Sequence, residues 1–308
     1  MTKASKILEV LRDDKPLRRL AGIVLTRLPF DAGKLFRINI RIQDYYIRLH
    51  SSSLSVKYWK NPNSRICDYK FITSYLKEDD IYIDVGANIG TTLIPAAMTT
   101  KGGKAIGFEP HPKIFSYLME NVSLNNLESS IDLHNCAIGN KRGYLNFSSE
   151  RTDDCNKVLL SKNGMTVPVK LLDDFVENYS KIDLIKIDVE GYEKFVVEGG
   201  IKAIEKTACI YFEVSEIYFR GFGYSMKQLL TKFEEIGFSL YIRKQSGMLE
   251  SINSEYHPSV HSAINVFAIR DINDFLRRTG WRIYDGGKFT GKPHEIPGQT
   301  PSSPSSLS

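Results

Sequence analysis

Hydrophobic and polar positions follow three different patterns along this chain. Over residues 1–30 the apolar positions recur at nearly helical spacing, which predicts a helix, and Pro29 marks its end. Between residues 37 and 49 apolar and polar residues alternate, which predicts a strand with one apolar face and its hairpin partner. From about residue 68 onward, short apolar runs alternate with helical stretches.

These apolar runs determine the expected fold class. Five of them have the length of buried strands, and they cover 81–85, 103–108, 131–138, 182–189 and 208–214. The segments between them have helical spacing, and the clearest helices are expected over 112–122 and 226–236. Strand–helix alternation predicts an α/β fold, with an open, mostly parallel sheet and helices on both of its faces.

Two segments depart from this alternation. Residues 140–180 are expected to be an insertion with strands of its own. The last 24 residues, 285–308, contain 13 Gly, Pro or Ser and are expected to be disordered, because they bury too little apolar surface to offset the entropy of ordering. The expected organisation is therefore an amino-terminal extension over 1–67, helical and then a β-hairpin, followed by a main domain over 68–284 and the tail.

Composition narrows the class of protein. The chain has 308 residues, of which 42% are hydrophobic and 25% charged, as in ordinary globular proteins. No apolar run reaches the roughly 18–20 residues that a membrane-spanning helix needs, and no signal peptide is expected. The four cysteines are scattered without metal-binding spacing, so neither a disulfide framework nor a zinc site is expected, and the predicted location is the cytoplasm.

Charge is distributed unevenly. Residues 1–60 hold 13 Lys or Arg and 5 Asp or Glu, a net charge of +8, whereas the whole chain carries +5. The remaining residues therefore sum to −3. A basic front predicts contact with an anionic partner such as a glycan, a carrier, lipid headgroups or nucleic acid, and the alternative is a solvated basic surface.

The first candidate site is the loop that follows the strand over 81–85. It begins at Asp84 and contains Gly86, Ala87, Asn88 and Gly90, where the glycines allow a tight turn and close approach of a ligand. The helix amino terminus beyond it offers N–H groups to a carboxylate or phosphate. Asn88 replaces the middle glycine of the dinucleotide fingerprint, which favours a ligand without a pyrophosphate. An ordinary strand-to-helix turn is the structural alternative.

Two further strand ends strengthen that hypothesis. Glu109 follows the second strand, 23 residues after Gly86, where a carboxylate can accept both hydroxyls of a ribose, although an acid at a helix N-terminus is the alternative. Cys136 and Ala137, in the third run, leave room for a flat ring such as adenine, or are simply core residues. Together these features predict a cofactor that contains a nucleoside.

The fourth strand ends in three charged residues. Lys186, Asp188 and Glu190 alternate with apolar neighbours, so they are expected to share one face at the carboxyl end of the strand. Charges in a buried parallel strand must be paired or used, which indicates an active site, with a structural Lys–Asp pair as the alternative. Glu213, at the end of the fifth strand, is a weaker candidate of the same kind.

With these motifs in place, the sequence resembles the FkbM family of S-adenosylmethionine-dependent methyltransferases. The resemblance covers roughly residues 37–270. The Lys-x-Asp-x-Glu-Gly element is its most specific part. The segments that carry the resemblance are 84–90, 108–110, 167–175, 185–191, 198–200 and 212–213.

The resemblance implies a class I, Rossmann-like methyltransferase fold and methyl transfer from S-adenosylmethionine. The acceptor is expected to be a hydroxyl of a sugar, glycan or natural product, with an anionic acceptor and peripheral membrane contact left open. If S-adenosylmethionine is the cofactor, Glu109 is expected to bind its ribose, and Cys136 and Ala137 are expected to face its adenine. The loop from Asp84 to Gly90 is expected to hold its amino-acid part.

The catalytic roles are assigned to the fourth strand. Asp188 is expected to position the methionine end of the cofactor, and Glu190 to orient or deprotonate the acceptor. Lys186 is expected to pair with a carboxylate. A Mg²⁺ ion that bridges Asp188 and the acceptor is an alternative, with His111 as the reserve base.

Two other classes of function stay open. One is a nucleic-acid methyltransferase, which the basic front suggests but the absence of a known nucleic-acid module disfavours. The other is a non-catalytic nucleoside-binding module on the same fold, which the charges at 186, 188 and 190 disfavour. A nicotinamide dehydrogenase is disfavoured by Asn88.

Overall fold

The computed structural model describes residues 31–148, 158–159, 164–244, 246–257 and 263–284, together with Leu20, Gly22 and Val24. Most of the helix predicted over 1–30 and the whole of the tail predicted over 285–308 lie outside these residues. Part of the insertion predicted over 140–180 also lies outside them. None of the helices in the described segments is long and apolar enough to cross a lipid bilayer.

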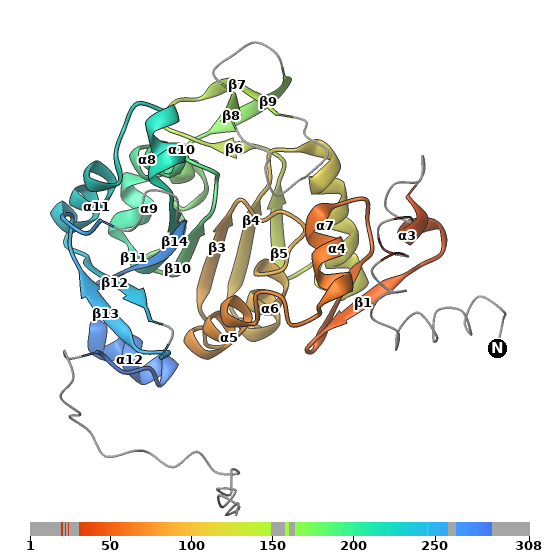
Figure 1. The fold of residues 1–308 in the computed structure, drawn as a ribbon, viewed down its shortest axis with the longest axis horizontal. Helices are drawn as coiled ribbons and strands as arrows, with labels where there is room; N and C mark the ends of the chain where they lie inside the picture. Colours follow the sequence, from red (N-terminus) through yellow and green to blue (C-terminus); the bar gives the residue numbers. More distant parts are fainter. Residues whose placement is uncertain are drawn as a thin grey trace, which may run out of the picture.

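A central eight-stranded sheet organises the fold, with the order β13-β12-β14-β11-β10-β3-β4-β5 (Figure 1). Its parallel part consists of β5, β4, β3, β10 and β11, whereas β14 runs antiparallel to both β11 and β12. This confirms the predicted class I methyltransferase arrangement. The strand bounds are β3 Ile81–Val85, β4 Lys104–Phe108, β5 Ile131–His134, β10 Ile182–Ile187, β11 Thr207–Val214, β12 Ser239–Arg243, β13 Leu249–Ile252 and β14 Ile264–Ile269.

The strand order places a crevice at the centre of this sheet. From β3 the chain moves outward through β4 to β5, and it then returns to β10 on the other side of β3. Ligands of open α/β sheets bind beyond the carboxyl ends of the strands where the order reverses in this way. The ends of β3 and β10 are therefore the place to look for a site.

Helices cover both faces of the sheet, because the parallel strands are apolar on both sides. One core cluster joins the sheet to α5, α6, α7 and α12, and a second joins it to α8, α9, α10 and α11. All six residues of β10 are buried, including Lys186. The helix bounds are α5 Ile66–Tyr75, α6 Leu93–Thr99, α7 Pro112–Leu124, α8 Glu193–Glu198, α9 Ile201–Glu205, α10 Glu216–Gly221, α11 Met226–Glu235 and α12 Ile272–Thr279.

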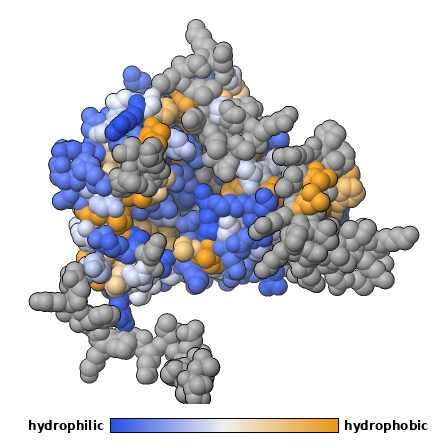
Figure 2. Space-filling model, viewed as in Figure 1, coloured by the Kyte–Doolittle hydropathy of each residue, from blue (hydrophilic) through white to orange (hydrophobic). Residues whose placement is uncertain are grey.

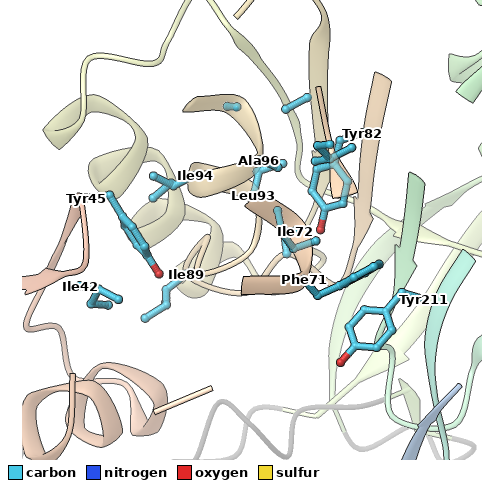
Figure 3. Close-up of a cluster of buried hydrophobic side chains, with 14 of the residues drawn as sticks. Ile42, Tyr45, Phe71, Ile72, Tyr82, Ile89, Leu93, Ile94, Ala96 and Tyr211 are labelled. Carbon is cyan, nitrogen blue, oxygen red and sulfur yellow. The ribbon is translucent and has the colours of Figure 1, made fainter. Parts of the chain in front are cut away.

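The predicted amino-terminal hairpin is confirmed. It consists of β1 (Asn39–Ile42) and β2 (Tyr45–Arg48), preceded by α3 (Ala32–Leu35) and followed by α4 (Ser53–Lys60). Its apolar face packs into the same cluster as α5 and α6 (Figure 3). The hydroxyl of Tyr45 also donates to the carbonyl of Thr91, at 3.0 Å, in the loop after β3.

That shared core bears on the predicted domain organisation. The expected boundary between 67 and 68 falls inside α5, and residues on both sides of it belong to one hydrophobic cluster. The hairpin therefore packs as part of the main body of the fold. The division at this boundary stays a prediction.

One predicted strand is corrected by the structure. The run over 131–138 forms two strands, because the chain turns at Cys136, whose N–H donates to the carbonyl of His134 at 3.1 Å. Only β5 belongs to the main sheet. The second part starts a separate four-stranded sheet that lies above the carboxyl end of the main one (Figure 1). Its strands are β6 Ala137–Ile138, β7 Gly143–Phe147, β8 Val158–Leu159 and β9 Met165–Lys170, and the 3-10 helix η2 Leu172–Phe175 follows.

Candidate active site

A pocket opens at the carboxyl ends of β3, β4 and β10, where the strand order reverses. The small sheet contributes Phe147 and Val158 to its wall, and α4 contributes Leu54. Figure 2 shows hydrophilic surface in the middle of the face on which Figure 1 views the sheet. The predicted site residues that line the pocket are Gly86, Ala87, Asn88, Glu109, Cys136, Ala137, Lys186, Asp188 and Glu190.

The glycine loop touches the end of β10. Gly86 has a φ of +89°, and a Cβ built on it would lie 2.0 Å from the carbonyl oxygen of Asp188. Only glycine fits here, because both the backbone conformation and the neighbouring backbone exclude a side chain. The loop continues through Asn88, whose φ is +49° and whose side-chain oxygen accepts from the N–H of Ile89 at 2.8 Å.

Glu109 is fixed by the backbone around it. One of its oxygens accepts from the N–H of Asn88 at 3.0 Å, and the other accepts from the N–H of His111 at 2.9 Å. The side chain is only 6% exposed. A carboxylate has about four lone-pair positions and can therefore accept more hydrogen bonds than these two.

Lys186 lies beneath the pocket between two carboxylates. Its Nζ is 3.4 Å from Oδ1 of Asp84 and 3.3 Å from Oδ2 of Asp188. Although burial acts to lower the pKa of Lys186, the charges of Asp188 and Asp84 raise it, so the ammonium form is retained. The predicted Lys–carboxylate pair is thus present, and it joins the strands β3 and β10.

Asp188 forms ion pairs with two cationic side chains, Lys186 and Arg65. Burial acts to raise its pKa, but Lys186 and the guanidinium of Arg65, whose Nη1 is 3.6 Å from Oδ2, together hold the pKa below its usual range. Arg65 is the N-cap residue of α5 and has a φ of +56°. Lys186 and Arg65 therefore favour the charged form of Asp188.

The alternation argument is correct for Lys186 and Asp188 but wrong for Glu190. The strand ends at Ile187, and the chain then turns through Glu190, whose φ is +53°. Glu190 reaches the pocket from this turn and not from a strand face. A non-glycine residue with positive φ is uncommon and needs support from its surroundings.

Glu193 supplies that support. This side chain, which is 2% exposed, accepts through Oε1 from the N–H groups of Val189 at 3.2 Å and Gly191 at 3.3 Å. These are the two neighbours of Glu190. In addition, the hydroxyl of Tyr224 donates to the carbonyl of Gly191 at 2.8 Å. These hydrogen bonds hold the turn that carries Glu190 in its conformation.

Three carboxylates meet at the mouth of the site. Asp188, Glu190 and Glu213 each place an oxygen within 4.8 Å of the others. Burial, followed by the charge of Asp188, raises the pKa of Glu190 to about 8 and that of Glu213 to about 7. Such groups can accept a proton near neutral pH, and the same oxygens are close enough to share a hard divalent cation.

Three residues lie differently from their predicted places. Asp84 is fully buried below the pocket, where its Oδ2 accepts from the hydroxyl of Thr92 at 2.6 Å in addition to pairing with Lys186. A Cβ on Gly90 would meet Leu118 of α7 at 2.8 Å, so this glycine faces the core. His111 uses Nδ1 to cap α7 by accepting from the N–H of Lys113 at 3.2 Å, and it does not line the pocket.

Sequence patterns did not indicate Arg65, Leu54 or Glu193. Arg65 and Leu54 precede the Rossmann-like part of the chain, and only the packing of α4 and α5 against the sheet brings them to the pocket. Glu193 lies two residues after Gly191, the last residue of the Lys-x-Asp-x-Glu-Gly element. Its role could have been predicted, because an acid at the start of a helix next to a tight turn often accepts backbone N–H groups. A second cavity adjoins the pocket and shares Arg65, Lys186 and Asp188 with it, and Glu213 lines this second cavity.

Comparison with known proteins places these residues in a family. A family model described as the methyltransferase FkbM domain matches residues 84–240, which is just over half of the chain. The chain is 28% identical over 142 residues to the hexuronic acid methyltransferase AglP of Haloferax volcanii, covering 45% of this chain and 57% of that protein. It is also 28% identical over 180 residues to the 2-O-methyltransferase NoeI of Sinorhizobium fredii, covering 51% of this chain and 72% of that protein.

The chain thus spans little more than half the length of AglP. Among solved structures, a precorrin-6y C5,15-methyltransferase from Geobacter metallireducens aligns with a TM-score of 0.40 and 11% identity. That alignment covers 67% of this chain and 89% of the other. A likeness of this size adds nothing about function.

Proposed function

We propose a function from one premise: this chain belongs to the methyltransferase FkbM domain family, and that membership implies S-adenosylmethionine as the methyl donor. The proposal is that the chain transfers a methyl group from S-adenosylmethionine to a hydroxyl oxygen of a sugar, within a glycan or a natural product. The single observation that carries it is the meeting of Asp188, Glu190 and Glu213 beside a pocket whose other end holds Glu109.

The pocket residues fit the proposed donor. Glu109 lines the pocket and is oriented by two backbone N–H groups, and a carboxylate in this place suits the hydroxyls of a ribose. Cys136 and Ala137 are small and line the pocket near β4, which suits the adenine. The Gly86–Asn88 turn would let the amino-acid end approach closely, although its own N–H groups are bonded to Phe108 and Glu109. Asp188 would bind the ammonium of the amino acid, since a carboxylate accepts from such a group.

The acceptor end is assigned to the carboxylates. When bound, the donor supplies a methyl carbon on a positively charged sulfur, and methyl transfer breaks the C–S bond as the C–O bond forms. Glu190 takes the proton that the acceptor hydroxyl loses, and Glu213 is its partner in titration. Asp188 stays ionised beside Lys186 and Arg65, so its negative charge faces the reacting centre throughout.

The choice of a sugar hydroxyl rests on chemistry and on relatives. Carboxylate oxygens are good acceptors for the hydroxyl donors of a carbohydrate. The names of two relatives refer to a hexuronic acid and to 2-O-methylation. An anionic group on the acceptor would have to lie away from the three carboxylates, because like charges there would repel it.

The experiment has a binding step and a turnover step. Thermal unfolding is measured with S-adenosylmethionine, with NAD and with a short RNA, and only the first is expected to raise the melting temperature by mass action. The protein is then incubated with the donor and a set of neutral and acidic sugars, and products are analysed by mass spectrometry for the gain of one CH₂. Stabilisation by RNA alone would favour the nucleic-acid alternative, and donor binding without methylation of any hydroxyl compound would favour the non-catalytic one.

A further inference from the structure

Exposed apolar side chains are concentrated at the amino-terminal edge of the molecule. Of the ten large hydrophobic side chains that are exposed among the described residues, five lie between positions 20 and 46. Figure 2 shows this hydrophobic surface over α3, at the right-hand edge of the view. The five are Leu20, Val24, Leu35, Phe36 and Tyr46. Scattered single exposures are normal, but a local cluster marks an interaction surface.

Three of these side chains lie at the end of α3 and on the hairpin that follows it. Leu35 ends α3 and Phe36 caps it, and they are 65% and 57% exposed. Arg37 then turns the chain with a φ of +51° into β1. On the outward face of the hairpin, Arg41 lies directly across from Tyr46, which is 41% exposed, because the two are register partners. We call Leu35, Phe36, Arg37, Arg41 and Tyr46 the amino-terminal patch.

The hairpin holds this patch rigidly. Its inward face, with Ile40 and Ile47, is buried in the main core. The N–H of Tyr46 donates to Oδ1 of Asn125 at 2.9 Å, and Nδ2 of Asn125 donates back to the carbonyl of Tyr46 at 2.7 Å. Arg41 and Tyr46 therefore lie on a strand pair that is anchored to the end of α7, and the other three patch residues directly precede that strand pair in the chain.

Charge indicates what the patch binds. The first 60 residues carry a net charge of +8. Within the described part of the chain, neither Arg37 nor Arg41 forms an ion pair, whereas the nearby Lys34 pairs with Glu120. Apolar side chains beside unpaired arginines match an anionic lipid surface, where the apolar groups enter the headgroup boundary and the cations meet the lipid phosphates.

We propose that the amino-terminal patch docks this protein on an anionic lipid surface. The patch and the pocket are linked through α4, which packs on β1 and places Leu54 in the pocket wall. Docking through the patch would hold the pocket at a constant position relative to the lipid. The proposal does not depend on the identity of the methyl acceptor.

The test is sedimentation of the full chain with lipid vesicles. Wild-type protein is expected to pellet with vesicles of phosphatidylcholine mixed with phosphatidylglycerol, and much less with phosphatidylcholine alone. The double variant Leu35→Ser/Phe36→Ser is expected to lower the partition coefficient roughly tenfold. Arg37→Gln/Arg41→Gln is expected to lower it by a similar factor on anionic vesicles only, and rising salt should weaken wild-type binding.

The matched control is Tyr144→Ser/Ile217→Ser, which removes two exposed apolar side chains, 76% and 48% exposed, from other parts of the surface. It is expected to bind like the wild type, and thermal unfolding verifies that every variant is folded. Equal binding of all three double variants, or no preference for anionic vesicles, overturns the proposal. A dimer in sedimentation velocity that Leu35→Ser/Phe36→Ser dissociates would also overturn it, by assigning the patch to a second copy of the chain.

Discussion

Two ends of the same pocket hold carboxylates in opposite surroundings. At the end of β4, each oxygen of Glu109 receives one backbone N–H group. At the ends of β10 and β11, Glu190 and Glu213 lie close to each other and to Asp188, and burial with the charge of Asp188 raises their pKa values to about 8 and about 7. The sheet positions both groups, but their neighbours differ.

That difference separates binding from proton transfer. A carboxylate surrounded by N–H donors is stable in its charged form and has a fixed direction, so it suits the hydroxyls of a ligand that must be held in place. Carboxyl groups surrounded by other carboxylates gain and lose protons near neutral pH, so they suit an acceptor that must lose one. Both roles remain proposals, and the following experiments test them separately.

The largest expected effect is on turnover. Glu190→Gln should lower kcat by roughly 10² or more, the scale of general acid–base groups, because an amide cannot take the acceptor's proton. Affinity for S-adenosylmethionine should stay within about twofold, since Glu190 is assigned to the acceptor and not to the donor. Steady-state kinetics and calorimetry measure the two quantities. Turnover at the wild-type rate would show that the base is another group, with Glu213 next in position.

At the other end of the pocket, the expected effect is on donor affinity. Glu109→Ala should weaken binding of S-adenosylmethionine by about 1.5–3 kcal/mol, the scale of hydrogen bonds to a charged group. Calorimetry on this variant is compared with Glu128→Ala, which removes an exposed carboxylate from the surface after α7. If both variants bind the donor as the wild type does, the ribose assignment is wrong.

The next effect in size is expected in the pH dependence of kcat. Because Glu190 must be deprotonated to act as the base and its pKa is raised to about 8, kcat should rise by roughly fiftyfold between about pH 6 and pH 8 and level off only above about pH 9. Removing the neighbouring charge in Glu213→Gln should move this rise to lower pH, since a nearby negative charge is one cause of the raised pKa of Glu190. A profile unchanged by Glu213→Gln would refute their coupling.

The same raised pKa values have a consequence for stability with a defined sign. Between about pH 4.5 and 8 the folded protein keeps protons on Glu190 and Glu193, whose pKa values are raised to about 8, that the unfolded chain releases. These groups therefore favour the folded state most at low pH within this window, and their contribution falls as pH rises. Denaturant unfolding at several pH values measures this trend.

A smaller effect on kcat is expected from Glu193, which supports the turn that carries Glu190. Glu193→Ala should lower kcat by roughly tenfold while leaving donor affinity unchanged, because the turn would lose the acceptor for the N–H groups of Val189 and Gly191. Faster hydrogen exchange at these two amides would identify the cause. Glu205→Ala, which removes an exposed carboxylate from α9, is the control. A fall in stability with unchanged kcat would reduce Glu193 to a structural role.

The smallest expected effect is that of metal removal. We expect EDTA to change kcat by less than about twofold, since the proton-transfer assignment needs no ion. Loss of activity that Mg²⁺ restores would instead mean that Asp188, Glu190 and Glu213 act as ligands. In that case the raised pKa values would fall on ion binding, because a cation favours the charged carboxylates.

The fold class and much of the site could be predicted from the amino-acid sequence alone. Apolar runs of strand length alternating with helical spacing allow few arrangements other than a sheet covered on both faces, and β3, β4, β10 and β11 lie within a residue or two of their predicted bounds. Because parallel strands end at one edge, Gly86, Glu109 and Asp188 could be assigned to one pocket from their positions after those strands.

The contacts among these groups, and their protonation states, could not be predicted because they depend on packing in three dimensions. Glu190 lies in a left-handed turn beyond the strand, and that turn depends on Glu193 and Tyr224, whose contacts no periodicity encodes. Arg65 and Asp188 are far apart in the sequence, and they meet only because α5 packs against the sheet. The pKa of a carboxyl group depends on burial and on charges a few ångströms away, and both are properties of packing in three dimensions.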